Sequence, residues 1–383
     1  MKALAMAPAL ASAFAEAQSF TDGSHQIAAF RHVLLRATKG ALQLTGTNIA
    51  TGYTTSVEAQ VGEGGDLVVP RELAEILKTC EGQVSLVIEK DTLKVSAEGF
   101  RGNFKGLPSS DYPSLPSTDM AVGQVGVDAS LLEAALALTT VAAGDDDGRI
   151  TSNLLLRFKP GEGKLTLIAT DGFRFSIATI AGLKITLQAP TDVLIPARSA
   201  VSLRRPLKAM GKEKATLGIT NDGKVLLSGG TVVWFAGQAT GTFPDLSPVL
   251  PKEAACTLAM PTGDLLQACK RLQAVARMAK SKKDASAAFT LDPEAGTLAM
   301  DSYADEAGSG SSIVKPTFGK GSQPTKAHLN IAYLIEALSV LQGLGAASCQ
   351  LAFPPQITQP ITVTAPLSNG PANLMGFAQL AKS

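Results

Sequence analysis

The sequence predicts an α+β protein of three similar domains, each with two helices packed on one face of a mostly antiparallel sheet. One pattern, a short apolar strand that leads into a helix, occurs at residues 68–77, 194–203 and 328–338. Repeats this far apart are whole domains, because solenoid units recur about every 20–50 residues. The length of 383 residues also fits two or three domains of about 150 residues each.

The domain boundaries follow from two similar exit segments. Residues 107–113 (LPSSDYP) close the first third of the chain, and residues 241–246 (GTFPDL) close the second. Proline and the turn-forming residues beside it interrupt both helices and strands. We therefore expect domains over residues 1–122, 123–252 and 253–383.

Alternating apolar residues predict the strands. Leu-x-Leu patterns in residues 42–48 and 165–172, and a weaker echo in 298–303, show the period of two that is typical of a strand with one buried face. The first two end in Asn or Asp-Gly, which favour turns. The second half of each third adds a pair of strands: residues 84–88 with 93–97, 216–219 with 225–228, and 349–353 with 361–364. Residues 221–223 (Asn-Asp-Gly) are typical of a hairpin turn.

The first residues allow two interpretations. Residues 1–15 loosely resemble a signal peptide with an Ala-x-Ala end. However, Pro8 interrupts the apolar run, which is mostly alanine rather than leucine. We favour a strand over residues 2–6 followed by a helix that opens with Pro8, because proline is favoured in the first turn of a helix.

The composition argues against several classes of function. The formal net charge is +1, so only a local cluster of charges can bind a polyanion. Aromatic residues make up 5% of the chain, which argues against a single-strand-binding surface built on base stacking. The sequence contains no run of about 20 apolar residues that predicts a membrane span. We therefore expect a cytoplasmic protein with no membrane partner.

Cysteine and histidine are too few and too scattered to predict a metal site. The four cysteines are Cys80, Cys256, Cys269 and Cys349. They form no Cys-x-x-Cys pair, and the chain has three histidines, so a zinc site has few available ligands. We expect reduced, buried cysteines and no metal or other cofactor.

Positive charge gathers in two stretches that we predict to be helical, residues 198–214 and 270–283. Basic helix faces bind nucleic-acid phosphates without reading base sequence, although a pair of solvated faces is the alternative. Because a proline inside a helix removes a hydrogen bond, we expect Pro206 to end the first helix near Arg205. The candidate phosphate-binding residues are Arg149, Arg198, Arg204, Arg205, Lys208, Lys270, Arg271, Arg277, Lys280, Lys282 and Lys283.

Three segments, in order and with the right spacing, carry a family resemblance. Residues 168–175 (IATDGFRF) resemble an Ala-Thr-Asp-Gly-His-Arg-Leu signature, and residues 241–251 (GTFPDLSPVLP) resemble a Gly-Arg-Phe-Pro-Asp-Tyr-x-x-Val-Leu-Pro segment. Residues 107–115 (LPSSDYPSL) resemble a Leu-Pro-Ala-x-Asp-Phe-Pro-x-Leu exit. These motifs belong to the bacterial sliding clamp family, the beta subunit of DNA polymerase III. The likeness runs over nearly the whole chain.

The resemblance implies the DNA clamp fold and a homodimeric ring, closed head to tail around duplex DNA, which tethers a polymerase and catalyses no reaction. The implied partners are double-stranded DNA without sequence preference, a second copy of the chain, the DNA polymerase, the clamp loader and other proteins with a clamp-binding motif. Geometry also favours a dimer, because six helices about 10 Å wide span an arc of about 60 Å, too short to enclose a hydrated duplex. Rough alignment places Phe104 and Val275 near the dimer interface, although either also fits an ordinary core position.

The resemblance further implies a cleft between the second and third domains that takes short peptides from partner proteins. An apolar groove with a few well-placed polar groups suits such a ligand. The residues carried over to the cleft are Thr170, Gly172, Phe173, Arg174, Phe175, Pro244, Val249, Met375, Phe377 and Leu380. Core packing is the alternative for Phe173, Phe175 and Val249.

The chain departs from the family pattern at this cleft. Phe173 replaces the usual histidine, Phe175 replaces the usual leucine, and Pro248 stands where an arginine is common. Ser152 replaces a cleft leucine, and the tail over residues 374–383 lacks the family's Met-Pro-Met-Arg-Leu ending. These changes predict either an altered peptide preference or a divergent clamp from a phage, a plasmid or an unusual bacterium.

Two other functions stay open at this point. In one, a peptide-binding hub of the clamp fold no longer encircles DNA. In the other, Asp145, Asp146 and Asp147 hold a hard metal ion for a metal-dependent enzyme, since such ions need oxygen ligands. Three adjacent acids followed by Gly148 are nevertheless more typical of a solvated loop. Residues 308–312 (GSGSS) do not form a P-loop, because they lack its Gly-Lys-Ser/Thr ending.

Overall fold

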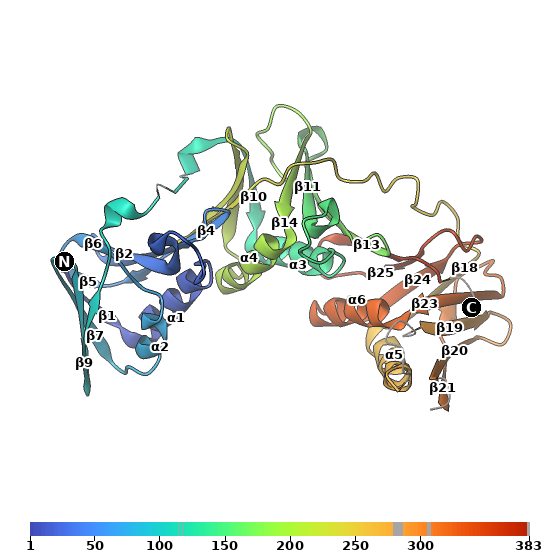
Figure 1. Cartoon of the computed structure of the whole chain (residues 1–383). Coiled ribbons are helices and arrows are strands. Elements are labelled where there is room, and N and C mark those ends of the chain that lie inside the picture. Colours follow the sequence, from blue (N-terminus) through green and yellow to red (C-terminus); the bar gives the residue numbers. More distant parts are fainter. Residues whose placement is uncertain (114, 117, 279–285, 305–307, 381–383) are drawn as a thin grey trace. The chain divides into compact units, whose positions relative to one another are not determined.

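The computed structural model describes residues 1–113, 115–116, 118–278, 286–304 and 308–380 (Figure 1). The chain forms two compact units. Unit 1 comprises residues 1–129, 185–188 and 205–238, and unit 2 comprises residues 130–184, 189–204 and 239–383.

Unit 1 holds two antiparallel sheets and two helices. The five-stranded sheet has the order β5 (Gln60–Glu63), β1 (Lys2–Met6), β7 (Gln83–Glu89), β8 (Thr92–Ala97) and β9 (Phe100–Lys105). The eight-stranded sheet has the order β10 (Ala121–Asp128), β15 (Lys214–Thr220), β16 (Lys224–Gly229), β17 (Val232–Gly237), β4 (Thr51–Glu58), β3 (Ala41–Thr47), β2 (His32–Thr38) and β6 (Gly65–Pro70). The helices α1 (Ala7–Gln18) and α2 (Leu73–Leu77) pack against each other, and α1 also packs against β3 and β4.

Unit 2 has the same kind of architecture. Its nine-stranded sheet has the order β14 (Thr191–Pro196), β11 (Asn153–Lys159), β12 (Lys164–Thr170), β13 (Arg174–Ile180), β26 (Ala372–Phe377), β25 (Ile361–Thr364), β24 (Ser348–Phe353), β18 (Cys256–Pro261) and β22 (Thr317–Phe318). Its four-stranded sheet has the order β21 (Gly308–Val314), β20 (Thr297–Ala304), β19 (Ser286–Asp292) and β23 (Thr325–Asn330). The helices α5 (Thr262–Ala276) and α6 (Ile331–Gly343) pack together.

Two more helices come from the middle of the chain. They are α3 (Ala129–Thr140) and α4 (Ala197–Met210), and α4 contributes residues to both units. Short 3-10 segments lie at Ala28–Arg31, Ser109–Asp111, Thr118–Met120, Ile150–Ser152 and Pro160–Glu162. Helices packed on antiparallel sheets confirm the predicted α+β class.

The strand–helix pattern that the sequence repeats is present three times. It is formed by β6 with α2, by β14 with α4, and by β23 with α6. In the third copy the Asn330 side chain accepts a hydrogen bond from the Ala332 N–H at 3.0 Å and so caps α6. The buried face of α6 includes Ile331, Leu334 and Leu338, at the spacing of an amphipathic helix.

The favoured interpretation of the first residues matches the structure. Strand β1 lies between β5 and β7 inside the five-stranded sheet. Helix α1 follows at once, with Pro8 in its first turn and Leu10 and Phe14 buried. Both the strand and the helix therefore contribute to the core of unit 1.

Helix α4 corrects the expectation for its C-terminal end. It does not end near Arg205 but continues through Pro206 to Met210. Leu203 and Leu207 are buried on either side of the proline, and burying each leucine contributes about 1.5–3 kcal/mol, enough to offset one missing hydrogen bond. The helix stops where Gly211 adopts a φ of 60° and its N–H donates to the Leu207 carbonyl.

The basic stretches are accordingly shorter helices than predicted. Lys214 lies on β15, where its ammonium pairs with Asp128 at 2.8 Å. Helix α5 ends at Ala276, with Arg277 as its C-cap residue. Lys280, Lys282 and Lys283 lie outside the described residues.

The predicted strand pairs all form. Strand β7 pairs with β8, β15 with β16, and β24 with β25. Between β15 and β16, Gly223 has a φ of 75°, which explains glycine at the end of this turn. The Lys224 N–H donates to the Thr220 hydroxyl at 2.9 Å and closes the turn.

The cysteines are free, and three of the four are buried: Cys256, Cys269 and Cys349. Burial raises the pKa of the Cys269 thiol to about 12, because the thiolate would be desolvated. Cys80 is half-buried. Among the described residues, no helix is both long and apolar enough to span a membrane.

Candidate functional site

Unit 2 contains a groove of about 350 Å³ beside the turn that joins β12 to β13. Its lining residues are Thr151, Thr170, Gly172, Phe173, Arg174, Phe175, Pro244, Asp245, Leu246, Val249, Thr358, Pro360 and Ala378. Seven of the ten residues predicted for the cleft are therefore brought together. The walls come from the β12–β13 turn, the exit segment after β17 and the loop before β25.

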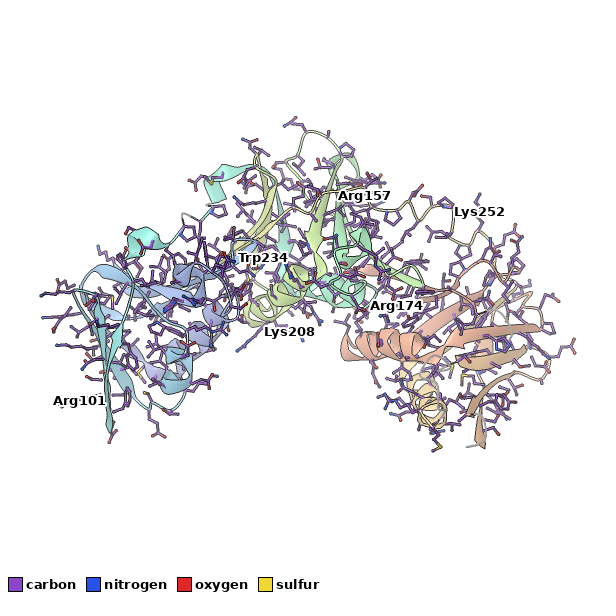
Figure 2. All side chains as sticks on the ribbon, in the orientation of Figure 1. Arg101, Arg157, Arg174, Lys208, Trp234 and Lys252 are labelled. Carbon is purple, nitrogen blue, oxygen red and sulfur yellow. The ribbon has the colours of Figure 1, made fainter. Side chains whose placement is uncertain are left out.

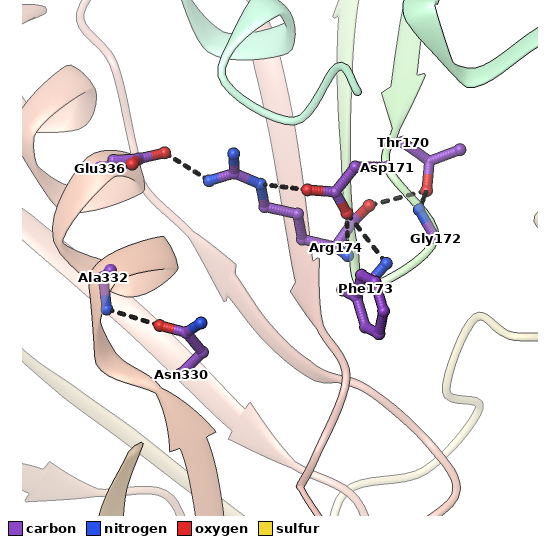
Figure 3. A network of polar contacts seen from close by, with 8 residues as sticks. All are labelled: Thr170, Asp171, Gly172, Phe173, Arg174, Asn330, Ala332 and Glu336. Atoms are coloured by element: carbon purple, nitrogen blue, oxygen red, sulfur yellow. Dashed lines mark hydrogen bonds and ion pairs between the residues drawn. The ribbon is translucent and has the colours of Figure 1, made fainter. Parts of the chain in front are cut away.

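The β12–β13 turn owes its shape to the Thr-Asp-Gly sequence. The Thr170 hydroxyl donates to the Arg174 carbonyl at 2.7 Å and accepts from the Gly172 N–H at 3.1 Å (Figure 3). The Asp171 carboxylate accepts from the N–H groups of Phe173 and Arg174, both at 2.9 Å. Gly172 has a φ of 91°, which a residue with a side chain rarely adopts. The motif is thus a self-bonded turn that presents Phe173.

Arg174 fastens this turn to α6. Its Nε donates to Asp171 at 2.9 Å, and its terminal nitrogen donates to Glu336 at 2.5 Å (Figure 3). Its guanidinium lies 4.2 Å from the centroid of the Tyr333 ring. The Arg174 side chain is 12% exposed. Burial, followed by the charge of Asp171, raises the pKa of Tyr333. The hydrogen-bonding and stacking groups of the Arg174 side chain are therefore already engaged by residues of the same chain.

The three aromatic and aliphatic candidates divide into two kinds. Phe173 is 63% exposed and Val249 is 45% exposed, so core packing does not account for either of them. Phe175 is buried on β13, and its ring lies over Gly376, where a Cβ would come within 2.2 Å of it. Phe175 therefore contributes to the sheet as well as to the groove.

The C-terminal candidates lie elsewhere than expected. Met375 and Phe377 are buried on β26 and are not among the lining residues, nor is the half-buried Leu380. Alternation along the strand turns these side chains into the core. Ala378 lines the groove instead, and its N–H donates to the Phe173 carbonyl at 2.8 Å. The tail therefore braces the groove through its backbone.

The loop before β25 is a wall that the sequence did not reveal. It contributes Thr358 and Pro360. The Gln379 side-chain amide holds the loop by donating to the Gln359 carbonyl at 3.0 Å. Prolines 354, 355 and 360 around this segment predict a rigid loop, but nothing local relates it to residues 170–175.

The exit segment packs against β11, β12 and β14. Phe243 and Leu246 pack against a small core of Leu155, Ile168 and Leu194. Ser152, expected in the cleft, is instead buried and donates to the Asp147 carboxylate at 2.9 Å. Its neighbour Thr151 lines the groove in its place.

The acidic loop over residues 145–147 forms ion pairs with two arginines. Asp146 pairs with Arg198 at 2.7 Å, and Asp147 pairs with Arg149 at 2.5 Å. Within the part of the chain that the structure describes, no group of three or more metal-binding side chains has the arrangement needed for an ion. The pairing gives these aspartates a role that needs no metal.

The remaining basic candidates differ in exposure. Arg204 pairs with the buried Glu133 at 3.0 Å and is 28% exposed, whereas Arg205 is 66% exposed beside Glu16 at 3.8 Å. Lys208 on α4 is exposed (Figure 2). On and after α5, the exposed basic residues are Lys270, Arg271 and Arg277.

The two predicted interface residues each lie beside an edge strand. Phe104 is half-buried on β9, at one edge of the five-stranded sheet. Val275 is half-buried on α5 and lies close to Gly310 of β21, at one edge of the four-stranded sheet. An edge strand leaves backbone groups available for pairing with another chain.

Comparisons with known sequences match most of this chain. Residues 2–116 match the model of the N-terminal domain of the DNA polymerase III beta subunit, and residues 126–245 match that of its central domain. The chain is 24% identical to the beta sliding clamp of Synechococcus elongatus over 315 residues, which cover 81% of this chain and 82% of that relative. It is 26% identical to the beta sliding clamp of Caulobacter vibrioides over 343 residues, 88% and 89% of the two chains.

Solved structures show the same fold. The DNA polymerase sliding clamp of Bacillus subtilis has a TM-score of 0.88 at 17% identity, with 100% of both chains covered. A DnaN sliding clamp of Pseudomonas aeruginosa, bound to griselimycin, has a TM-score of 0.88 at 19% identity over 100% of both chains. The architecture is thus the DNA clamp fold. The chain belongs to the bacterial sliding clamp family, that of the DNA polymerase III beta subunit, as the sequence motifs predicted.

Proposed function

We propose that this protein is a DNA sliding clamp: two copies close into a ring around duplex DNA, tether the replicative polymerase and bind partner peptides in the groove of unit 2. The observation that carries the proposal is a clamp fold over the whole chain with a groove formed at the Thr-Asp-Gly turn. The three domains over residues 1–122, 123–252 and 253–383 belong to the same proposal.

The DNA-facing surface consists of basic residues that contact phosphates without reading sequence. Lys208, Lys270, Arg271 and Arg277 are exposed, as such contacts require. Arg149, Arg198 and Arg205 also contribute, because surface ion pairs are worth only about 0–1 kcal/mol and exchange readily for phosphate. Lys280, Lys282 and Lys283 stay part of the proposal as predicted from the sequence.

Arg204 has a different role from its neighbours. Glu133, its partner, is 6% exposed, and removing one member of a buried pair leaves an uncompensated charge. We therefore assign Arg204 to holding α4 against α3 rather than to binding DNA.

Ring closure would use the free edges of β9 and β21, with Phe104 and Val275 at the contact. A head-to-tail dimer places the first domain of one copy against the third domain of the other, twice, about a twofold axis. Edge pairing supplies backbone hydrogen bonds, and the two half-buried side chains supply apolar area. The expected solution mass is twice 39.5 kDa.

The groove is the docking site for the polymerase, the clamp loader and other partners in the cytoplasm, and the clamp itself makes or breaks no bond. Phe173 and Val249 supply exposed apolar surface for a peptide anchor. Phe175, Thr170 and Pro244 form the walls beside them. Met375, Phe377 and Leu380 support the groove through the strand and tail rather than by direct contact.

Topological retention on DNA tests the proposal. After loading onto nicked circular DNA, the protein should stay bound through gel filtration and should be released when the circle is cut. The control is the same DNA linearised before loading. Equal retention on circular and linear DNA would contradict the ring and leave a peptide-binding hub as the better explanation.

A further inference from the structure

The groove of unit 2 has an apolar mouth but an acidic border. The mouth is formed by Phe173 and Val249, both well exposed. Among the lining residues, the only charged side chains are those of Arg174 and Asp245. The balance of charge around them indicates what kind of peptide the groove selects.

On the side of the groove that contacts α6, one cation forms ion pairs with two anions. Arg174 donates both to Asp171 and to Glu336, so its single positive charge is shared. The Glu336 side chain is 52% exposed, whereas that of Asp171 is 15% exposed. A negative charge is therefore left over, and Glu336 is the carboxylate that solvent or a ligand reaches.

A second anion, Asp245, lines the groove itself. The Asp245 carboxylate accepts from the N–H and the hydroxyl of Ser247, at 2.9 and 2.7 Å. These hydrogen bonds lower the pKa of Asp245 and keep it charged at neutral pH. Arg157, the cation whose field reaches Asp245, is already held by Asp192 through two nitrogens at 2.9 and 2.8 Å. Asp245 is thus not neutralised by a partner of its own.

A third anion lies on the acidic loop, which is fixed to the groove wall. The Gly144 N–H donates to the carbonyl of Thr151, a lining residue, at 2.9 Å. Asp146 and Asp147 of this loop hold arginines, whereas no ion pair is present for Asp145 among the described residues. The charge of Asp145 helps to raise the pKa of Tyr333, so its field reaches the ring beneath Arg174.

The charges named above carry a clear negative surplus. Seven carboxylates (Asp145, Asp146, Asp147, Asp171, Asp192, Asp245 and Glu336) face four guanidinium groups (Arg149, Arg157, Arg174 and Arg198), which leaves three negative charges. The chain as a whole carries +1, so this border differs in sign from the molecule around it.

We propose that the groove selects an apolar peptide with basic flanking residues and discriminates against one with acidic flanking residues. The inference rests on the proposed function of the groove as a peptide site. Its apolar mouth supplies the anchor contacts, and complementary charge at the border supplies the preference. Glu336 and Asp245 are the residues that determine it, since both are exposed, Asp245 lines the groove and Glu336 pairs with the lining residue Arg174.

Peptide binding to the full chain tests the proposal directly. Two fluorescent peptides share a core of leucine and phenylalanine and differ only in flanking lysines or flanking glutamates. Fluorescence anisotropy at about 0.1 M salt should show the lysine peptide binding about tenfold tighter. The difference should shrink strongly at about 1 M salt, where the Debye length falls from about 10 Å to about 3 Å.

Two variants and a matched control locate the effect. Asp245→Asn and Glu336→Gln should each reduce the preference for the lysine peptide about two- to threefold while leaving the far-UV circular dichroism unchanged. Glu162→Gln removes a carboxylate that pairs with Lys159 and Lys164 and does not line the groove, and it should leave the preference unaltered.

The outcomes separate this inference from the function on which it rests. If both peptides bind equally, or the glutamate peptide binds tighter, the charge preference is wrong and the peptide groove stands. If neither peptide binds, or if Phe173→Ala leaves the binding of both unchanged, the groove is not a peptide site and both proposals fail. A preference that all three variants reduce alike would show that it arises from overall charge, which also overturns the inference.

Discussion

Replacing Arg174 with alanine tests how the groove turn is held. Arg174 is the residue that joins the β12–β13 turn to α6, through Asp171, Glu336 and the ring of Tyr333. With alanine at this position the turn keeps its own hydrogen bonds but loses its attachment to α6. We therefore expect a less stable unit 2 and a displaced Phe173.

The magnitude follows from the exposure of each partner. The bond to Asp171 is sheltered on both sides and is a charge-assisted one, worth about 1.5–3 kcal/mol. The bond to Glu336 is half-exposed and contributes less than about 1 kcal/mol, and the stack on Tyr333 contributes about 0.5–1 kcal/mol. The expected loss is about 3 kcal/mol, or a Tm lower by about 6–12 °C for a unit of this size.

The assay combines thermal unfolding with peptide anisotropy. Alanine at position 174 should weaken peptide binding at least about tenfold, in line with the displaced turn. Lysine at position 174 is the matched control, because it keeps the charge but has neither the planar fork nor the stacking face of arginine. If Arg174 positions the turn, the lysine variant should lose stability and affinity as well.

Two results would refute this reasoning. An Arg174→Ala protein with an unchanged Tm and unchanged affinity would show that the turn needs no attachment to α6. A lysine variant with full affinity would show that the charge of Arg174 contacts the peptide directly.

Three further predictions concern other parts of the chain. Gly376→Ala should destabilise unit 2 by about 1–3 kcal/mol in chemical denaturation, since the new Cβ would meet the Phe175 ring at 2.2 Å; unchanged stability would mean that the ring moves aside freely. Arg271→Gln should lower the slope of log affinity for duplex DNA against log salt by about 0.9 without altering sequence preference, and an unaltered slope would place this residue away from DNA. At pH 8 a thiol reagent should modify the half-buried Cys80 first, because burial raises the pKa of Cys269 to about 12 and leaves it protonated and sheltered; equal rates at both sites would contradict this.

Local patterns predicted much of the fold. The three strand–helix repeats and the hairpins depend on neighbours in sequence, so their periodicity and turn residues were sufficient. The end of α4 depends instead on tertiary burial: Leu207 and Met210 lie in the core, and the helix continues through Pro206 to place them there. A rule about proline that considers only the local sequence cannot include the free energy gained by burying these side chains.

The site was predictable where one segment forms it and unpredictable where several meet. Residues 170–175 make their own turn, so their motif was informative. Thr358 and Ala378 reach the groove only because separate strands bring them there. The register of β26 against β13 decides which side chains of the tail face the groove. The sequence of the tail does not reveal this register, so the prediction placed Met375 and Phe377 in the groove although they face the core.

The ladder between β13 and β26 has a consequence for the rate of partner capture. Its last pair, Arg174 with Phe377, lies directly between the groove turn and the bracing residue Ala378. Two walls of the groove are thus neighbouring ends of one hydrogen-bonded ladder, and neither wall can swing open without breaking it. The site is already assembled before a peptide binds, so binding requires little loss of conformational entropy in the clamp. Association should then follow a single phase whose rate rises in proportion to peptide concentration, with no slow opening step to limit it.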